Sequence, residues 1–310
     1  MSEFFTISVL VTTLASGIRL ATPFLLASLG ESVGQRSGVL NLGVEGVMLI
    51  GAYAAYYTAL ETGSALAGVG AAIVAGFLMG IVYAVMTVGM RAEQGISGIG
   101  IFLFGLGLSD LLFQKQVGTP VSIKGLTDWD IPLLSEIPHL GEILFQHNPL
   151  VYTAFLLVPV TWFMVQRTTF GLNIRAVGET PEAADTLGVS VSRVRTCTIL
   201  IGNTMAGLAG AALALEVGNF QQNLTSGRGF IAIALVYFGA WRAFGVLAGS
   251  LLFGIVSATV LQWKTLGIVE GGTASLTSMA PAVLTIVVLV LVSRRFGQPA
   301  ALTKPFDRSA

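Results

Sequence analysis

Long apolar runs without any Asp, Glu, Lys or Arg dominate the chain. A helix needs about 20 mostly apolar residues to cross a bilayer, and each of these runs is long enough. We therefore predict a membrane-spanning helix in each of five runs: Thr62–Met90, Ile143–Gln166, Thr196–Leu215, Ala243–Trp263 and Gly271–Ser293.

Further apolar segments are either interrupted by a charge or too short to span alone. The interrupted ones are Phe4–Gly30 with Arg19, Val39–Leu60 with Glu45, and Gly95–Gln114 with Asp110 near its end. Gly229–Trp241 is predicted to be a short or re-entrant helix, or one arm of a hairpin. The pattern predicts an all-α polytopic membrane protein with about eight to ten transmembrane helices in a single domain, residues 1–310.

The composition excludes several other classes of protein. Charged residues make up 10% of the chain and hydrophobic residues 54%, whereas an ordinary soluble domain carries about 25% charged residues. The net charge is zero, which argues against a nucleic-acid-binding surface. The single cysteine, Cys197, excludes an internal disulfide. His139 and His147 lie in one polar stretch, which we interpret as a solvated loop rather than a metal site.

The loop charges predict an orientation. Arginine and lysine favour the cytoplasmic side of a membrane. Eleven basic residues then fall on that side: Arg36, Arg91, Arg167, Arg175, Arg193, Arg195, Arg242, Arg294, Arg295, Lys304 and Arg308. Four fall on the other side with the extracytoplasmic loop at about 115–148: Lys115, Lys124, Arg228 and Lys264. This predicts an external N-terminus and a cytoplasmic C-terminus, so the number of crossings must be odd and must include the short segment.

The predicted cytoplasmic loop, about 168–194, contains a short helix with clear start and stop signals. Thr180 is a candidate N-cap, Pro181 suits the first helical position, and Gly188 suits the left-handed stop. A helix of two turns is marginal alone in water, so the membrane domain or a partner must hold it.

Three stretches resemble permease subunits of bacterial ABC importers of the ribose, branched-chain amino acid and nucleoside group. The first carries the Gly-Glu-x-x-x-Ala-Ala pattern of the family's coupling helix at residues 178–184, followed by Gly188. The second, residues 38–52, contains Asn41, Gly43, Glu45 and Gly46 in the form typical of nucleoside permeases. The third, residues 227–254, resembles the family's short segment and following helix, with Ala243 where proline is common.

The resemblance implies the fold, partners and function of an importer's membrane subunit. A separate ATPase would bind ATP and Mg, because this chain lacks the GxxxxGK[ST] phosphate loop and is expected to bind no cofactor itself. An extracytoplasmic binding protein would deliver the substrate, and a related but different permease would complete the path. The expected location is the bacterial inner membrane. Contact with the ATPase is expected from Gly178, Glu179, Pro181, Glu182, Ala183, Ala184, Asp185, Leu187 and Gly188. Nucleosides are the favoured substrate; simple sugars, riboflavin and branched-chain amino acids are the alternatives.

Charged and polar residues inside the apolar runs are candidates for the substrate path, because such groups are costly in lipid. We expect Arg19 and Glu45 to form a buried pair, or one of them to line the path. Asn41 and Asn203 are further candidates for the path. For Asn203 an interhelical hydrogen bond is the simpler alternative. Asp110 and Glu216, near span ends, are expected to reach the interface.

Two other functional classes make different demands on the sequence. A secondary transporter needs a coupling carboxylate inside the membrane, and Glu45 is its best candidate. An intramembrane enzyme needs a nucleophile with a base, or metal ligands, and no histidine lies in a predicted span. Small residues four apart, such as Gly76 and Gly80 or Ala206 and Gly210, predict close helix packing.

Overall fold

The computed structural model describes residues 6–267, 269, 271–292 and 297–307, and most of them are helical. The predicted all-α membrane fold is confirmed. The elements in chain order are α1 (Ile7–Arg36), α2 (Val44–Thr62), α3 (Ala65–Ala84), the π-helical turn η2 (Val85–Gly89), α4 (Gln94–Gln116), β1 (Trp129–Asp130), α5 (Leu140–Leu144), β2 (Gln146–His147), α6 (Pro149–Arg167), α7 (Thr169–Glu179), α8 (Pro181–Thr186), α9 (Val191–Val217), α10 (Arg228–Phe238), α11 (Ala243–Thr265), α12 (Gly271–Ser278) and α13 (Ala280–Val292).

Six of the described helices are long and apolar enough to cross a membrane: α1, α3 with η2, α4, α6, α9 and α11. The predicted run Gly271–Ser293 differs from expectation because it forms two helices, α12 and α13, divided at Met279; Ser293 lies outside the described residues. Phe4, at the start of the first predicted run, also lies outside them.

The ends of several helices are set by side-chain caps. Asn148 Oδ1 accepts hydrogen bonds from the backbone N–H groups of Leu150 (3.1 Å) and Val151 (3.2 Å), and Pro149 occupies the first helical position of α6. Glu93 caps α4 in the same way through Gly95 N and Ile96 N, and these hydrogen bonds lower the pKa of its carboxyl.

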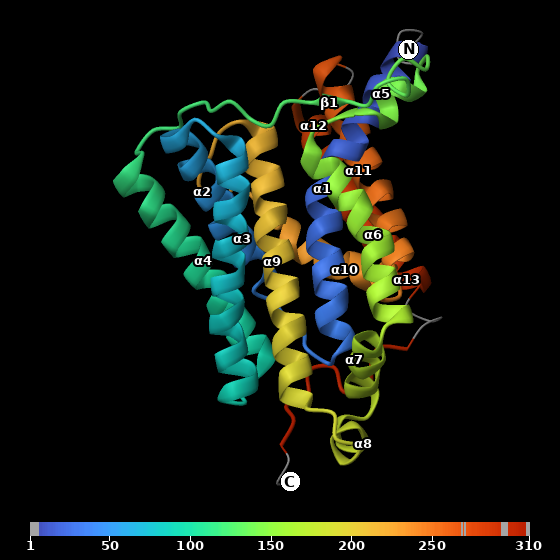
Figure 1. Ribbon diagram of the computed structural model, residues 1–310. Helices are drawn as coiled ribbons and strands as arrows, with labels where there is room; N and C mark the ends of the chain where they lie inside the picture. Colours follow the sequence, from blue (N-terminus) through green and yellow to red (C-terminus); the bar gives the residue numbers. More distant parts are fainter. Residues whose placement is uncertain (1–5, 268, 270, 293–296, 308–310) are drawn as a thin grey trace.

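Helix α9 occupies the centre of the bundle, with α1, α2 and α3 packed around it (Figure 1). The close approach of these helices depends on small residues at their contacts, as the sequence predicted. A Cβ added at Gly207 of α9 would lie 2.9 Å from the Cα of Gly76 in α3. Gly210 meets the backbone of Met48 in α2, and Gly254 of α11 meets the backbone of Gly17 in α1. The spacing of small residues therefore serves packing within this chain.

Substituting a glycine at this contact should destabilise the bundle. In Gly76→Val the new side chain would meet the backbone of Asn203 and Gly207, and overpacking of this kind costs about 1–3 kcal/mol. Gly70→Val, in the same helix, is the matched control, because nothing lies within 4 Å of a Cβ there. We expect a lower melting temperature in detergent for the Gly76 variant alone. Equal melting temperatures for the two variants would contradict the packing argument.

The two ends of the bundle differ in charge and structure. The end that carries α7 and α8 is here called the α8 end (Figure 1). Three basic residues expected on the cytoplasmic side lie in the last turns of α1 and α6 and in α7: Arg36, Arg167 and Arg175. There Arg91 forms an ion pair with Asp307 (2.5 Å), and Arg195 donates a hydrogen bond to Lys304 O (2.9 Å). Helix α1 begins at the opposite end and the described C-terminal segment finishes at the α8 end, as the predicted odd number of crossings requires. Arg294, Arg295 and Arg308 lie outside the described residues.

The end opposite α8 is covered by the extended segment 117–148 (Figure 1). Its two short strands pair antiparallel, with Trp129 opposite His147. His147 is buried, so the prediction of a solvated loop for both histidines is wrong for this one. Burial lowers the pKa of His147, whose Nε2 lies 2.8 Å from Ile143 O. Among the described residues, no group of three His, Cys, Asp or Glu side chains is arranged to hold a metal ion.

Candidate functional site

The first functional candidate is Glu45, in the first turn of α2. Its side chain is 1% exposed. One carboxylate oxygen accepts hydrogen bonds from Thr225 Oγ1 (2.5 Å) and Gly227 N (2.6 Å), and the other accepts one from Gly229 N (2.5 Å). These groups form the entry to helix α10, whose first N–H groups have no partner within the helix. A carboxylate from one helix therefore neutralises the positive end of another.

The glycines around Glu45 are needed for this contact. Gly227 has φ +85°, a left-handed conformation that favours glycine. A Cβ added at Gly229 would lie 2.6 Å from the Cα of Glu45. A Cβ added at Gly46 would likewise lie 2.7 Å from the Cα of Phe102 in α4. The pattern of Gly43, Glu45 and Gly46 thus reflects a three-way junction of α2, α4 and α10.

This junction lies inside the membrane layer rather than at its surface. Gly43 contacts Ile101, seven positions into α4, and a helix rises about 1.5 Å per residue, so the junction is about 10 Å from the start of α4. Figure 1 places α10 midway along the bundle, beside α1. With 11 residues, α10 measures about 16 Å and cannot span the layer by itself. Arg228, which was expected on the outer side, is the first residue of this internal helix.

The non-helical segment before α10 completes the crossing. It begins at Gly218, whose carbonyl accepts a hydrogen bond from Ile123 in the extended segment, and it descends to Gly227. Four of its polar side chains are exposed: Gln221, Gln222, Asn223 and Ser226. Irregular backbone at membrane depth occurs where it is covered by protein or lines a water-filled cavity. This face is therefore the candidate for the substrate path or for contact with a second membrane subunit.

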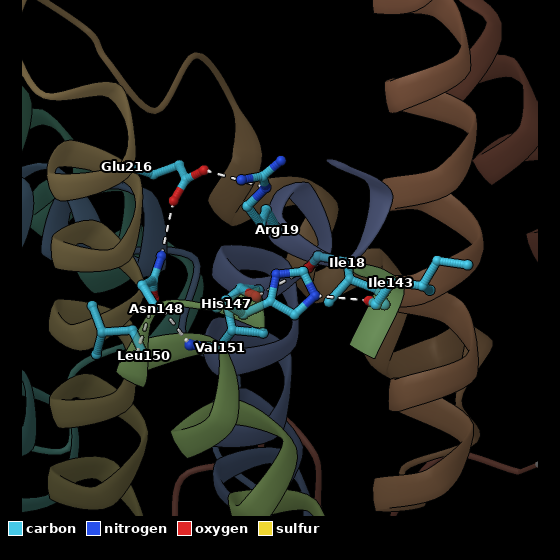
Figure 2. Close-up of polar contacts among 9 residues, drawn as sticks. Ile18, Arg19, Ile143, His147, Asn148, Leu150, Val151 and Glu216 are labelled. Atoms are coloured by element: carbon cyan, nitrogen blue, oxygen red, sulfur yellow. Dashed lines mark hydrogen bonds and ion pairs between the residues drawn. The ribbon is translucent and has the colours of Figure 1, made fainter. Parts of the chain in front are cut away.

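Arg19 does not pair with Glu45, so that prediction is wrong. Figure 2 shows Arg19 beside Glu216, with 3.8 Å between Arg19 Nε and Glu216 Oε1. Glu216 also accepts a hydrogen bond from Asn148 (2.9 Å). The pair joins α1, α6 and α9 near the extended segment, and both side chains are about one-third exposed. The error arose because adjacency in sequence does not place two helical positions at the same depth.

Asn41 and Asn203 are brought together. The hydrogen bond expected for Asn203 is present, but its partner lies in the α1–α2 linker rather than in another helix. Asn41 Nδ2 donates to Asn203 Oδ1 (3.1 Å), which joins the α1–α2 linker to α9. Asn203 Nδ2 donates to Ile199 O (2.9 Å), so the amide is satisfied on both sides. Both residues are buried, and their hydrogen bonds support the linker rather than face open space.

Glu31 is a buried carboxyl group that the sequence reasoning missed. Its Oε1 accepts hydrogen bonds from Gln35 Nε2 (2.9 Å) and Asn41 N (3.0 Å). Gln35 Oε1 then accepts one from Trp241 Nε1 (2.8 Å), at the turn between α10 and α11. The missed signal was the spacing of Glu31 and Gln35, four apart on a helix that continues past Gly30 to Arg36.

A short helix is present at the predicted place as α8, at one end of the bundle and outside the layer of spans (Figure 1). Glu182, Ala183, Leu187 and Gly188 are exposed, and Leu187 is exposed to 85%. Pro181 and Ala184 are buried. Gly188 has φ +86°, as the stop signal predicted. Thr180 is the N-cap residue, but its side chain makes no capping hydrogen bond, so that detail is wrong.

The remaining residues of the predicted coupling set have different surroundings. Gly178 is buried, contacts the backbone of Arg36, and accepts a hydrogen bond from Ala301 N (2.9 Å). Glu179 is exposed as the last residue of α7, and Asp185 is half-buried in α8. Gly178 therefore holds the loop against the membrane domain, while Leu187 and its exposed neighbours are open to a partner.

A bundle of spanning helices with an internal half-helix and an exposed short helix at one end is the architecture of a multi-pass membrane protein. Residues 13–292 match the family described as the permease component of the branched-chain amino acid transport system, and the chain belongs to this family of ABC transporter permeases. No solved structure matches the chain.

Curated relatives cover nearly the whole chain. A putative glucose ABC transporter permease, TsgC13 of Haloferax volcanii, is 37% identical over 94% of this chain and 96% of its own length. The nucleoside permease NupC of Lactococcus lactis is 34% identical over 87% and 89%. The guanosine permease NupQ of Bacillus subtilis is 33% identical over 92% and 93%. The relatives therefore include both nucleoside and sugar permeases.

Proposed function

We propose that this permease is one of two membrane subunits of an ATP-driven importer of nucleosides. The observation that carries the proposal is the entry to α10, where the Glu45 carboxylate already occupies the positive helix end. A half-helix whose N-terminus is free attracts anionic substrate groups. With that end neutralised, the path suits an uncharged ligand that forms hydrogen bonds, which favours a nucleoside over an amino acid carboxylate.

Aromatic residues beside this entry favour a ligand with a flat ring. Phe230 lies one turn beyond Ser226 and is 40% exposed. It meets Phe102 of α4 edge to face, with ring centroids 5.2 Å apart. Aromatic faces stack on nucleobases, while the exposed amides of residues 221–223 can bind hydroxyl groups. NupC and NupQ are relatives with nucleoside and guanosine in their names, which agrees with this choice.

The proposed mechanism uses partners on both sides of the membrane. A binding protein delivers substrate to the end that carries the extended segment, and a partner ATPase that binds ATP and Mg docks on α8. A related permease completes the path against the α10 entry. Closure of the ATPase moves α8 and switches access, provided that ATP and the loaded binding protein favour different conformations. The α8 end is then cytoplasmic, in the bacterial inner membrane, with the N-terminus outside.

Transport by the reconstituted system tests this proposal. The permease, its ATPase, the second permease and the binding protein are placed in proteoliposomes, and uptake of radiolabelled guanosine, uridine, glucose, valine and riboflavin is measured with and without ATP. We expect ATP-dependent uptake of nucleosides. Uptake of glucose alone would favour the sugar alternative, which TsgC13 supports. Uptake without ATP would indicate a secondary transporter.

A further inference from the structure

A cavity of about 1060 Å³ opens at the α8 end of the bundle, apart from the α10 entry. Its walls come from the last turns of α1 and α6 and from the turn that joins α10 to α11. The volume is at the upper end of the range of small-molecule sites. None of the functions described above uses this cavity.

Three arginines line the cavity at one level. Arg36 is the last residue of α1, Arg167 is the last residue of α6, and Arg242 is the N-cap residue of α11. Arg36 Nε donates to Trp241 O (3.0 Å), which holds its side chain at the wall. No Asp or Glu is among the described residues that line the cavity. The described lining therefore carries three arginines and no carboxylate, at the place where α1 and α6 end and α11 begins.

Aromatic side chains lie at the same level as these arginines and indicate that this level is the membrane–water interface. Trp162 of α6 and Phe244 of α11 lie at the cavity, with ring centroids 6.2 Å apart. The Arg167 guanidinium lies over the Trp162 ring at 5.6 Å. Tryptophan is enriched at the headgroup level of membranes. Towards the middle of the layer, α6 and α11 expose Val160 and Leu252, apolar side chains suited to acyl chains.

We propose that this cavity binds the headgroup of an anionic phospholipid, with the phosphate contacting Arg167 and Arg242 and the acyl chains lying against α6 and α11. Basic pockets between transmembrane helices on the cytoplasmic side are suited to such headgroups. The exposed apolar faces that flank the cavity favour a lipid over free phosphate, because inorganic phosphate has no apolar part that could pack against them. The proposal does not depend on which substrate is transported.

The experiment compares lipids on the purified full-length chain. Native mass spectrometry and thermal melting are recorded with phosphatidylglycerol, phosphatidylcholine and inorganic phosphate. We expect phosphatidylglycerol to be retained and to raise the melting temperature, while the other two have no such effect. The variant R167Q/R242Q should bind phosphatidylglycerol about thirtyfold more weakly, given the usual contribution of each arginine near a membrane surface. R193Q, an exposed arginine of α9 that does not line the cavity, is the control for loss of a single positive charge elsewhere on the protein and matches the single variant R242Q in charge.

Several outcomes would overturn the proposal. These are equal retention of phosphatidylcholine and phosphatidylglycerol, equal weakening in R193Q, unchanged binding in R167Q/R242Q, or stabilisation by inorganic phosphate alone, which would indicate a free-anion site. If the double variant does not insert, R242Q alone should weaken binding about fivefold on the same reasoning. Unchanged binding in that single variant would also contradict the assignment.

Discussion

Glu45→Gln should impair uptake strongly and lower the stability of the membrane domain by about 2–3 kcal/mol, the range for lost hydrogen bonds to a buried charged group. The Glu45 carboxylate accepts three hydrogen bonds from the entry to α10. A glutamine offers one acceptor oxygen, and its NH₂ group would face a backbone N–H. Helix α10 would then lose its anchor on α2. Uptake in proteoliposomes and the melting temperature in detergent measure the two effects.

Glu61→Gln is the matched control for this change. Glu61 is in the last turn of the same helix, is exposed, and forms no hydrogen bond or ion pair with the α10 entry. Thr225→Val removes one of the three donors and should have a smaller effect in the same direction, of about 1 kcal/mol. Equal effects of the Glu45 and Glu61 variants, or none in Thr225→Val, would show that the α10 anchor does not matter for transport.

Leu187→Asp should abolish coupling between ATP hydrolysis and transport while the chain still inserts into the membrane. Leu187 is 85% exposed beyond the spans, so the substitution removes no contact inside the chain. Burying a leucine side chain against a partner contributes about 1.5–3 kcal/mol, and a carboxylate in its place would add a desolvation cost. We expect uptake to fall at least about tenfold. In the same variant, the loaded binding protein should no longer stimulate ATP hydrolysis.

Leu133→Asp tests whether any exposed leucine outside the spans would give the same result. Leu133 is 82% exposed in the extended segment, at the end where the binding protein is proposed to dock, so Leu133→Asp should leave the ATPase contact at α8 intact and is a control for that contact only. Ala183→Arg, on the exposed side of α8, should behave like Leu187→Asp. Ala184→Arg should instead destabilise the loop, since Ala184 is 3% exposed in an apolar cluster with Val177 and Val194. Normal uptake in Leu187→Asp and Ala183→Arg would rule out α8 as the contact.

Local signals in the sequence predicted α8 and the six described helices that are long and apolar enough to span a membrane. Val39–Leu60, also predicted as a span, corresponds to α2 and is not among those six. The length of a charge-free run is set by the thickness of the bilayer, and the Pro and Gly that bound α8 are set by backbone preferences. Both signals depend only on residues that are neighbours in the sequence. The same signals failed for the run 271–293, where the chain divides at Met279. They also missed Glu31, because the predicted span ends at Gly30 whereas the helix continues to Arg36.

The sequence by itself determined that this is a polytopic helical permease with a short helix outside the membrane, and it singled out Glu45. Only the tertiary structure decided the partners of the charges. Arg19 meets Glu216, and Glu45 meets the backbone of residues 227 and 229, more than 180 positions away. Helical periodicity specifies which face a residue occupies, but depth and neighbouring helix follow from how close small residues allow the backbones to approach.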